Sequence, residues 1–174
     1  MITGKPFLTT EQIDKKVKEL AQKISKDYKG KDILAVGILK GAFMFFSDLV
    51  KLIQVPMDID FITVSSYVKS RSSGAMNIHS DLREDVRKRH VLLIDDIVDT
   101  GLTLNYIKNL LLERKPASLK ICTFLDKKSC RQADIKLDYV GYTIPNHYIV
   151  GYGLDYENKF RNLPYISIFK EVNK

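Results

Sequence analysis

Long hydrophobic runs are missing from this sequence. Its longest uncharged apolar stretch, Ile33 to Leu39, is far shorter than the roughly 20 residues that a membrane-spanning helix needs. The N-terminal residues also lack the apolar segment of a secretory signal peptide. We therefore expect a chain that neither spans a membrane nor is exported, and we place it in the cytoplasm.

Cysteine is scarce, and the common glycine-rich phosphate motifs are absent. The two cysteines, Cys122 and Cys130, are spaced as neither a C-x-x-C redox pair nor a zinc ligand set, so reduced thiols in a cytoplasm are the simplest interpretation. The sequence contains neither G-x-x-x-x-G-K-[S/T] nor G-x-G-x-x-G. ATP-loop and dinucleotide-binding functions therefore lose their main support.

The composition is that of a soluble globular chain with one substantial core. Of 174 residues, 45% are hydrophobic and 28% are charged, and we expect one domain over residues 1–174. The net charge of +7 would suit a phosphorylated metabolite or RNA, so charge alone does not choose a partner. Against this basic background, three acids stand out directly after an apolar run: Asp95, Asp96 and Asp99.

The first part of the chain alternates helix and strand patterns. Thr9 and Gln12 have capping-box spacing, and apolar residues then recur at helical intervals until Gly30. The run Ile33 to Leu39 predicts a buried strand, and an apolar-rich stretch from Ala42 to Ile53 predicts the helix that follows it. This order of strand, tight turn and helix is typical of α/β proteins.

A second unit of the same kind follows. Met57 to Val64 alternates with period two, which predicts a half-buried strand. Residues 65–74 are rich in serine and lead toward a short strand around Ile78, so we expect a mobile loop at about 65–76. Val91 to Ile94 then predicts a strand, and Leu102 to Arg114 predicts a helix.

The last third of the chain carries mainly strand patterns. They lie at 119–125, 139–144, 148–152 and 165–169, each bounded by turn residues. Together with the earlier alternation, they predict an α/β fold with a central, mainly parallel sheet flanked by helices.

The acidic segment lies where open α/β sheets bind ligands, at the carboxyl end of a predicted strand. Asp95 and Asp96 end that strand, and Thr100, Gly101 and Thr103 begin the next helix, whose free amides and hydroxyls favour a phosphate. Aspartates also end strands and cap helices for purely structural reasons. A phosphorylated ribose, with hydroxyls and a bound Mg²⁺, would satisfy both the acids and the anion site.

The string from Val91 to Leu104 resembles the phosphoribosyl pyrophosphate (PRPP) motif of type I phosphoribosyltransferases: four apolar residues, two acids, two apolar residues, Asp-Thr-Gly, and Thr after one residue. Outside the motif, the chain resembles the hypoxanthine-guanine subgroup of that family from about Val36 to Phe169. The matching segments are Leu39-Lys40-Gly41-Ala42, Ser65-Ser66-Tyr67, Lys127, and Tyr148 to Arg161.

The resemblance implies a fold, a reaction and partners. The fold would be of the type I phosphoribosyltransferase kind, with a small hood from about 1–30 and 145–174 and a lid at 65–76 that excludes water. The reaction would move the 5-phosphoribosyl group from PRPP to N9 of hypoxanthine or guanine, giving IMP or GMP and pyrophosphate, with Mg²⁺ as cofactor. The chain would form a homodimer or homotetramer.

Two alternatives stay open. One is a transferase that prefers xanthine or acts on a pyrimidine. The other is an RNA-binding regulator that uses the PRPP motif as a sensor, although such a protein would not need the purine-side matches at Lys127, Tyr148 and Asp155. We therefore do not expect a nucleic-acid partner.

The resemblance also assigns roles to residues. Asp99 would accept the purine N7 proton as the catalytic residue. The PRPP and phosphate-binding residues would be Asp95, Asp96, Ile97, Val98, Asp99, Thr100, Gly101, Leu102 and Thr103. Pyrophosphate would be bound by Leu39, Lys40, Gly41 and Arg161, and the purine by Lys127, Tyr148, Ile149 and Asp155. Mg²⁺ would be held by Asp95, Asp96 and Asp155, and the lid would include Ser65, Ser66 and Tyr67.

Two positions depart from the family pattern, and one bond is singled out by it. Asp95 stands where many members have glutamate, so its shorter side chain would weaken the ribose contact or shift it to water. Gly153 stands where alanine is common, which we expect to matter little. The bond between Leu39 and Lys40 is often a cis peptide in this family.

Overall fold

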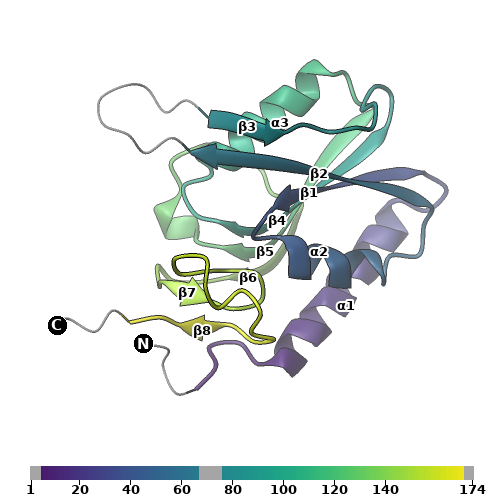
Figure 1. Ribbon diagram of the computed structural model, residues 1–174. Coiled ribbons are helices and arrows are strands. Elements are labelled where there is room, and N and C mark those ends of the chain that lie inside the picture. Colours follow the sequence, from purple (N-terminus) through teal and green to yellow (C-terminus); the bar gives the residue numbers. More distant parts are fainter. Residues whose placement is uncertain (1–4, 67–75, 171–174) are drawn as a thin grey trace.

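A six-stranded sheet forms the centre of the computed structural model, which describes residues 5–66 and 76–170 (Figure 1). Its spatial order is β3-β2-β1-β4-β5-β6, and every neighbouring pair is parallel except β2 and β3. The strands are β1 (Ile33–Leu39), β2 (Met57–Ser66), β3 (Met76–Ser80), β4 (His90–Val98), β5 (Ser118–Asp126) and β6 (Tyr139–Thr143). The expected α/β class with a mainly parallel sheet is confirmed.

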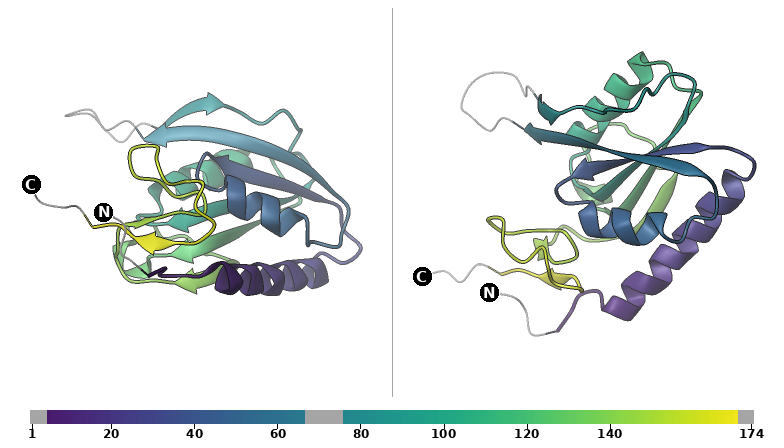
Figure 2. Two further views of the ribbon diagram at one scale, coloured as in Figure 1. Left: turned by 60° about the horizontal axis from the view of Figure 1, so that its bottom comes forward. Right: turned by 45° about the vertical axis from the view of Figure 1, so that its right-hand side comes forward.

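Helices cover both faces of this sheet (Figure 2). α1 (Thr10–Asp27) and α2 (Phe43–Val50) share one apolar cluster with Ile33 and Ala35 of β1. α3 (Leu102–Glu113) belongs to the cluster on the opposite face, with Leu34 and Val36. The continuous apolar run of β1 is thus explained, because a central parallel strand is buried on both faces.

Helix boundaries follow local capping. The predicted capping box is present, since Gln12 N–H donates to Thr9 Oγ1 over 3.3 Å and Thr9 N–H donates to Gln12 Oε1 over 2.9 Å. α2 ends at Val50, before the predicted Ile53, and its first residue follows Ala42, which makes no side-chain cap. No helix of the described residues is long and apolar enough to cross a membrane.

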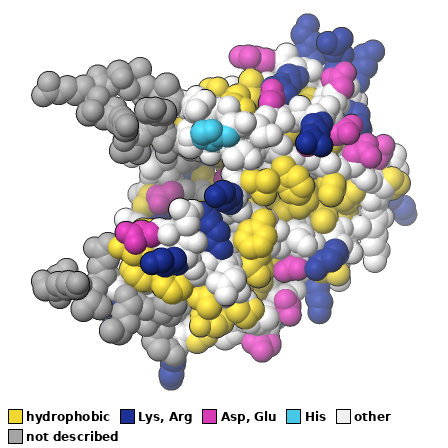
Figure 3. Space-filling view, viewed as in Figure 1, with side chains coloured by type: hydrophobic (Ala, Val, Ile, Leu, Met, Phe, Trp, Pro, Cys, Tyr) yellow, Lys and Arg dark blue, Asp and Glu magenta, His cyan; other side chains and the backbone are white. Residues whose placement is uncertain are grey.

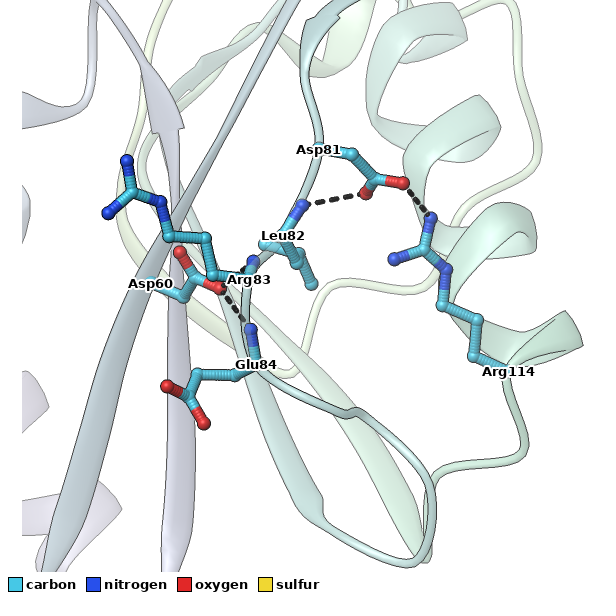
Figure 4. Close-up of polar contacts among 6 residues, drawn as sticks. All are labelled: Asp60, Asp81, Leu82, Arg83, Glu84 and Arg114. Carbon is cyan, nitrogen blue, oxygen red and sulfur yellow. Dashed lines mark hydrogen bonds and ion pairs between the residues drawn. The ribbon is translucent and has the colours of Figure 1, made fainter.

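At Ile59 and Asp60 of β2 the burial is the reverse of what alternation suggests. Ile59 is 53% exposed, whereas Asp60 is only 9% exposed. The Asp60 carboxylate accepts hydrogen bonds from the backbone N–H groups of Arg83 (2.7 Å) and Glu84 (2.9 Å), as Figure 4 shows. Since a buried carboxylate needs such donors, Asp60 fixes the connection between β3 and β4.

Asp81 anchors the same connection to α3. Its carboxylate accepts from the Leu82 N–H and pairs with Arg114 at 2.6 Å (Figure 4). The Arg114 guanidinium lowers the pKa of Asp81. The start of the β3–β4 connection, directly after β3, is therefore held against the C-terminal end of α3.

A hood of irregular chain lies beside the carboxyl ends of the large sheet's strands (Figure 1). It contains the antiparallel pair β7 (Ile149–Val150) and β8 (Ser167–Ile168). The N-terminal segment joins it through a bridge between Leu8 and Ile166. α1 itself packs on the large sheet, and its buried residues share one apolar cluster with those of the hood.

The strand order creates a place for a ligand. From β1 the chain continues to β2 on one side, and it then returns to β4 on the other side of β1. The connections that leave the carboxyl ends of β1 and β4 therefore run to opposite sides, toward β2 and β5. Such a topological switch point is the position at which open α/β sheets bind ligands. The segments that resemble the PRPP family begin at these ends.

Candidate active site

The phosphate loop, defined here as residues 95–103, runs from the end of β4 into α3. Asp95 to Val98 belong to the strand, Asp99 to Gly101 form the turn, and Leu102 and Thr103 begin the helix. Gly101 has a φ of +78°, a conformation that glycine adopts without steric cost. A cavity of about 120 Å³ is lined by Asp95, Ile97, Val98, Asp99, Thr100, Gly101, Thr103 and Leu104.

The two carboxylates at the end of β4 both have raised pKa values. Burial raises the pKa of Asp95 well above its usual range, and the neighbouring charge of Asp96 raises it further. Burial also raises the pKa of Asp96, while Asp95 and the positive charge of Arg161 oppose that rise. A pair held in this way favours a cation or hydroxyl donors beside it.

Gly41 brings the turn after β1 against this pair. A Cβ atom on Gly41 would lie 2.1 Å from Asp96 Oδ2, so any side chain here would displace the carboxylate. The peptide bond between Leu39 and Lys40, one residue before Gly41, is cis, and the Lys40 side chain is exposed. The predicted pyrophosphate turn and the predicted ribose carboxylate are therefore in direct contact.

Gly153 brings the backbone of the hood into contact with the same turn. It has a φ of +97°, and a Cβ atom there would lie 2.0 Å from the carbonyl oxygen of Gly41. The expectation that glycine instead of alanine matters little at this position is wrong for this chain. Glycine allows the hood backbone to touch the turn after β1.

Asp99 and Lys127 form an ion pair of 3.1 Å across the ends of β4 and β5. The Lys127 side chain is only 9% exposed and that of Asp99 is 50% exposed. Lys127 N–H also donates to the carbonyl of Val98 over 2.9 Å. The buried lysine therefore presents its ammonium beside a carboxylate that remains open to a ligand.

The hood residues form their own network. Arg161 pairs with Asp155 at 2.7 Å and donates to the carbonyl of Gly153 over 2.7 Å. Tyr148 is 55% exposed, and its hydroxyl donates to the backbone carbonyl of Asp155 over 3.3 Å. Ile149 is buried in β7. Arg161 thus connects the hood with the sheet, since its charge also acts on Asp96.

The predicted lid coincides only partly with the described residues. Ser65 and Ser66 belong to β2, so they extend the strand where we expected a loop. Ser65 Oγ lies 2.7 Å from Nε2 of His79 in β3, because the two strands pair beyond Thr63. Tyr67 and the following residues up to 75 lie outside the described residues.

Within residues 5–66 and 76–170, no three His, Cys, Asp or Glu side chains are placed to hold a metal ion together. Asp95 and Asp96 lie at the end of β4, whereas Asp155 belongs to the hood and pairs with Arg161. A protein site with one or two carboxylates suits Mg²⁺, which keeps waters and substrate phosphates as its other ligands.

Sequence reasoning missed three positions around the site. The sequence drew attention to Gly153 but not to its contact with Gly41. The alternation in β2 suggested that Asp60 is exposed, whereas it is buried. Arg131, whose aliphatic chain packs beneath Gly101, was not singled out at all. A buried ion pair has no sequence periodicity, so only the spacing of opposite charges in Asp126 to Arg131 could have indicated it.

Comparison with known proteins agrees with this geometry. The family profile of the phosphoribosyl transferase domain matches residues 6–157. The hypoxanthine-guanine phosphoribosyltransferase of Bacillus subtilis is 48% identical over 167 residues, covering 95% of this chain and 93% of the relative. That of Staphylococcus aureus (strain Mu50) is 49% identical over 165 residues, covering 94% and 92%.

A solved structure shares the fold as well. The crystal structure of a hypoxanthine phosphoribosyltransferase from Staphylococcus aureus superposes with a TM-score of 0.92 at 48% identity, covering 96% of this chain and 91% of the other. Both the resemblance seen in the sequence and the expected type I fold are confirmed. The chain belongs to the phosphoribosyltransferase family, as one of its hypoxanthine-guanine phosphoribosyltransferases.

Proposed function

We propose that the protein transfers the 5-phosphoribosyl group of PRPP to N9 of hypoxanthine or guanine. N9 bonds to C1′ of the ribose, the C1′–O bond breaks, and its electron pair leaves with pyrophosphate. The purine N7 proton passes to a base on the protein, and the products are IMP or GMP and pyrophosphate. Relatives at 48–49% identity with this activity in their names support the proposal.

The observation that carries the proposal is the pair of Lys127 and Asp99, 3.1 Å apart. A 6-oxopurine protonated at N7 presents an acceptor, O6, directly beside a donor, N7–H. Lys127 can donate to O6 while Asp99 accepts from N7–H. Adenine presents an amino donor in place of O6 and would leave the buried lysine unpaired, which disfavours its binding.

Asp99 serves as the general base in this scheme. N7–H becomes more acidic as N9 bonds to carbon, so a carboxylate can take the proton in the transition state. The half-exposed Asp99 side chain leaves room for the base beside it. Tyr148 stacks on the purine face, and the backbone of Ile149 meets its position-2 edge.

The phosphate loop holds the other substrate. The amides and hydroxyls of Thr100, Gly101 and Thr103 bind the 5′-phosphate at the N-terminus of α3. Asp95 and Asp96 accept hydrogen bonds from the ribose hydroxyls. The cavity of about 120 Å³ along this loop supports that arrangement.

Cationic groups serve the leaving pyrophosphate. Charge builds on pyrophosphate as the C1′–O bond breaks, so positive charge fixed beside it stabilises the transition state more than the ground state. Arg161 supplies this charge from the hood. Leu39, Lys40 and Gly41 supply a lysine and backbone groups from the turn after β1.

The donor set fits Mg²⁺. Asp95, Asp96 and Asp155 would be the carboxylates that hold it, directly or through water. Burial raises the pKa values of Asp95 and Asp96, and the charge of Asp96 raises that of Asp95 further, so a divalent cation beside them would favour their ionised forms. When bound, Mg²⁺ neutralises phosphate charge. To hold Mg²⁺, Asp155 would give up part of its ion pair with Arg161.

We further propose that the chain acts as a cytoplasmic homo-oligomer, in which residues 1–174 form one domain with a hood. Figure 3 shows hydrophobic side chains gathered over α2 and β2, where Phe43 is 43% and Ile59 is 53% exposed. An exposed apolar face of this kind is typical of an interface. Ile59→Asp should lower the sedimenting mass, and an unchanged mass would remove this face from the interface.

Turnover with separate bases tests the reaction. The purified protein is mixed with PRPP, Mg²⁺ and, in turn, hypoxanthine, guanine, xanthine, adenine or uracil, and nucleotide formation is followed by absorbance. We expect turnover with hypoxanthine or guanine and none with adenine or uracil. Turnover with xanthine alone would reassign the substrate. PRPP binding without turnover on any base would favour the sensor alternative.

A further inference from the structure

An ion pair lies beneath the phosphate loop and has no role in the scheme above. Arg131 follows the short 3₁₀ turn η1 (Lys128–Cys130), and its guanidinium donates to the carboxylate of Asp126 at the end of β5. The two side chains are only 17% and 11% exposed. Because desolvating two charges costs free energy, apolar residues would fill this place at least as stably.

The aliphatic part of Arg131 packs directly under the turn of the phosphate loop. A Cβ atom on Gly101 would lie 2.8 Å from Cδ of Arg131. Arg131 Nε is buried and lacks a hydrogen-bond partner among the described residues. The guanidinium is thus held by one strong contact to Asp126, and its stem supports the backbone at Gly101.

The residues after Arg131 hold the same turn by backbone hydrogen bonds. The N–H groups of Gln132 and Ala133 both donate to the carbonyl of Thr100, over 2.9 and 3.1 Å. In a trans peptide unit the carbonyl and the N–H point in opposite directions. Fixing the Thr100 carbonyl toward Gln132 and Ala133 therefore turns the Gly101 N–H away from them. Thr100 and Gly101 both line the cavity of about 120 Å³.

We propose that Arg131, held by Asp126, is a positioning residue for PRPP. It sets the position of the 131–133 segment, which in turn orients the Thr100–Gly101 peptide so that the Gly101 N–H meets the 5′-phosphate. This inference rests on the proposed function of the phosphate loop. It also links the two substrates, because only the turn η1 separates the segment from Lys127, the residue proposed to read the purine.

Arg131→Met is the first test, because methionine keeps most of the aliphatic stem and removes the guanidinium. We expect the KM for PRPP to rise about tenfold, while the KM for hypoxanthine and kcat change less than about threefold. The matched control is Arg114→Met, which breaks an arginine–aspartate pair at the opposite end of α3. The control should leave the KM for PRPP within about twofold of wild type.

The double variant Arg131→Met/Asp126→Asn separates positioning from stability. It removes the carboxylate that the single variant leaves buried and unpaired, so the melting temperature should return toward that of wild type. The KM for PRPP should stay raised about tenfold if Arg131 positions the loop. A KM that recovers together with the melting temperature would overturn the proposal.

Calorimetric binding of PRPP with Mg²⁺ distinguishes failure of this inference from failure of the proposed function. A wild-type protein that forms no IMP would contradict the proposed reaction. The same wild-type and variant proteins would still test positioning, through a weaker PRPP affinity in both Arg131 variants. Equal affinity in wild type and double variant would contradict the positioning role, whether or not IMP is formed.

Discussion

The two halves of the site are built from different kinds of backbone. The sheet half consists of the ends of β1, β4 and β5, where β1 pairs with β2 up to Leu39 and β4 pairs with β5 up to Val98. Among its described residues, the hood half has only the two-residue strands β7 and β8. Four of its residues other than glycine have positive φ angles within the described chain: Tyr152, Glu157, Asn158 and Phe160.

This difference separates two tasks. The sheet half places a phosphate loop and a carboxylate pair on rigid strands, which suits a group that must be held still during bond cleavage. The hood half presents Tyr148, Asp155 and Arg161 from loops, which suits the roles proposed for them in binding the base and releasing pyrophosphate. The halves meet where Gly153 touches Gly41 and where the charge of Arg161 reaches Asp96.

The largest effect is expected in the sheet half, from Asp99→Asn. The amide cannot take the N7 proton, so kcat should fall by about 10² to 10⁴. PRPP affinity should change little, because the carboxylate pair and the amides of the loop remain. Steady-state kinetics and calorimetric PRPP binding measure the two quantities.

Asp81→Asn is the control for Asp99→Asn, since it also removes a carboxylate from an ion pair with a cation. It lies at the β3–β4 connection and should leave kcat near that of wild type. An Asp99→Asn variant with wild-type kcat on hypoxanthine would remove Asp99 from its role.

The sheet half could largely be predicted from the sequence. The run Ile33 to Leu39 is apolar because both of its faces are buried, and such a run is visible without a structure. The string from Val91 to Leu104 gathers most of the phosphate site in one segment, so its chemistry could be recognised locally. The structure adds the register that brings Lys127 to Asp99.

The hood and the supports of the site could not be predicted in the same way. Positive φ angles at Tyr152 or Phe160 have no signal in residue type, because these residues adopt them only under tertiary constraint. The burial of Asp60 depends on backbone donors more than 20 positions away. The importance of Gly153 depends on the carbonyl of Gly41, which is distant in sequence.

Gly41→Ala tests the point where the halves meet, and its effect should be the second largest. The added methyl would overlap Asp96 Oδ2, so the carboxylate or the turn must move. A displacement of about 1 Å at such a site costs about 10² in kcat/KM. The control is Gly30→Ala, where φ is positive, unlike at Gly41, but nothing lies within 4 Å of the added atom.

The Gly30→Ala control should lose about 1 kcal/mol of stability through backbone strain and keep its activity. If both variants lose activity equally, the loss would come from general destabilisation. The close contact between Gly41 and Asp96 would then not be needed for activity.

Arg161→Met tests the hood half and should lower kcat by about tenfold to a hundredfold, since charge stabilisation of pyrophosphate is lost. It should also move the pH profile. Arg161 opposes the rise in the pKa of Asp96, so its removal raises that pKa further. If ionised Asp96 is needed, the acidic limb of the kcat/KM profile should shift to higher pH. Arg83→Met, far from the site on the β3–β4 connection, should leave that limb unchanged.

The smallest effect is expected from Asp95→Asn. This variant measures how far a buried charge in the sheet half lowers the free energy of unfolding of the ligand-free protein. The pKa of Asp95 is raised in the folded state, so the ionised carboxyl destabilises the fold above that pKa. The destabilisation declines as the pH falls below the folded pKa and is gone below the unfolded pKa, where the carboxyl is protonated in both states. Asparagine carries no charge, so the variant should be more stable than wild type by about 1 kcal/mol at pH 8.

The gain in stability from Asp95→Asn should shrink as the pH is lowered, while Mg²⁺-dependent PRPP binding weakens at every pH. Asp81→Asn gives the opposite sign, because Arg114 lowers the pKa of Asp81 and that stabilisation is present at neutral pH and lost in acid. Denaturant unfolding at several pH values measures both.

If Asp95→Asn leaves stability unchanged at pH 8, repulsion within the carboxylate pair does not strain the free protein. If it behaves as expected, the sheet half is held in an unfavourable charge state that its ligands relieve, whereas the Asp155–Arg161 pair in the hood is already satisfied without them.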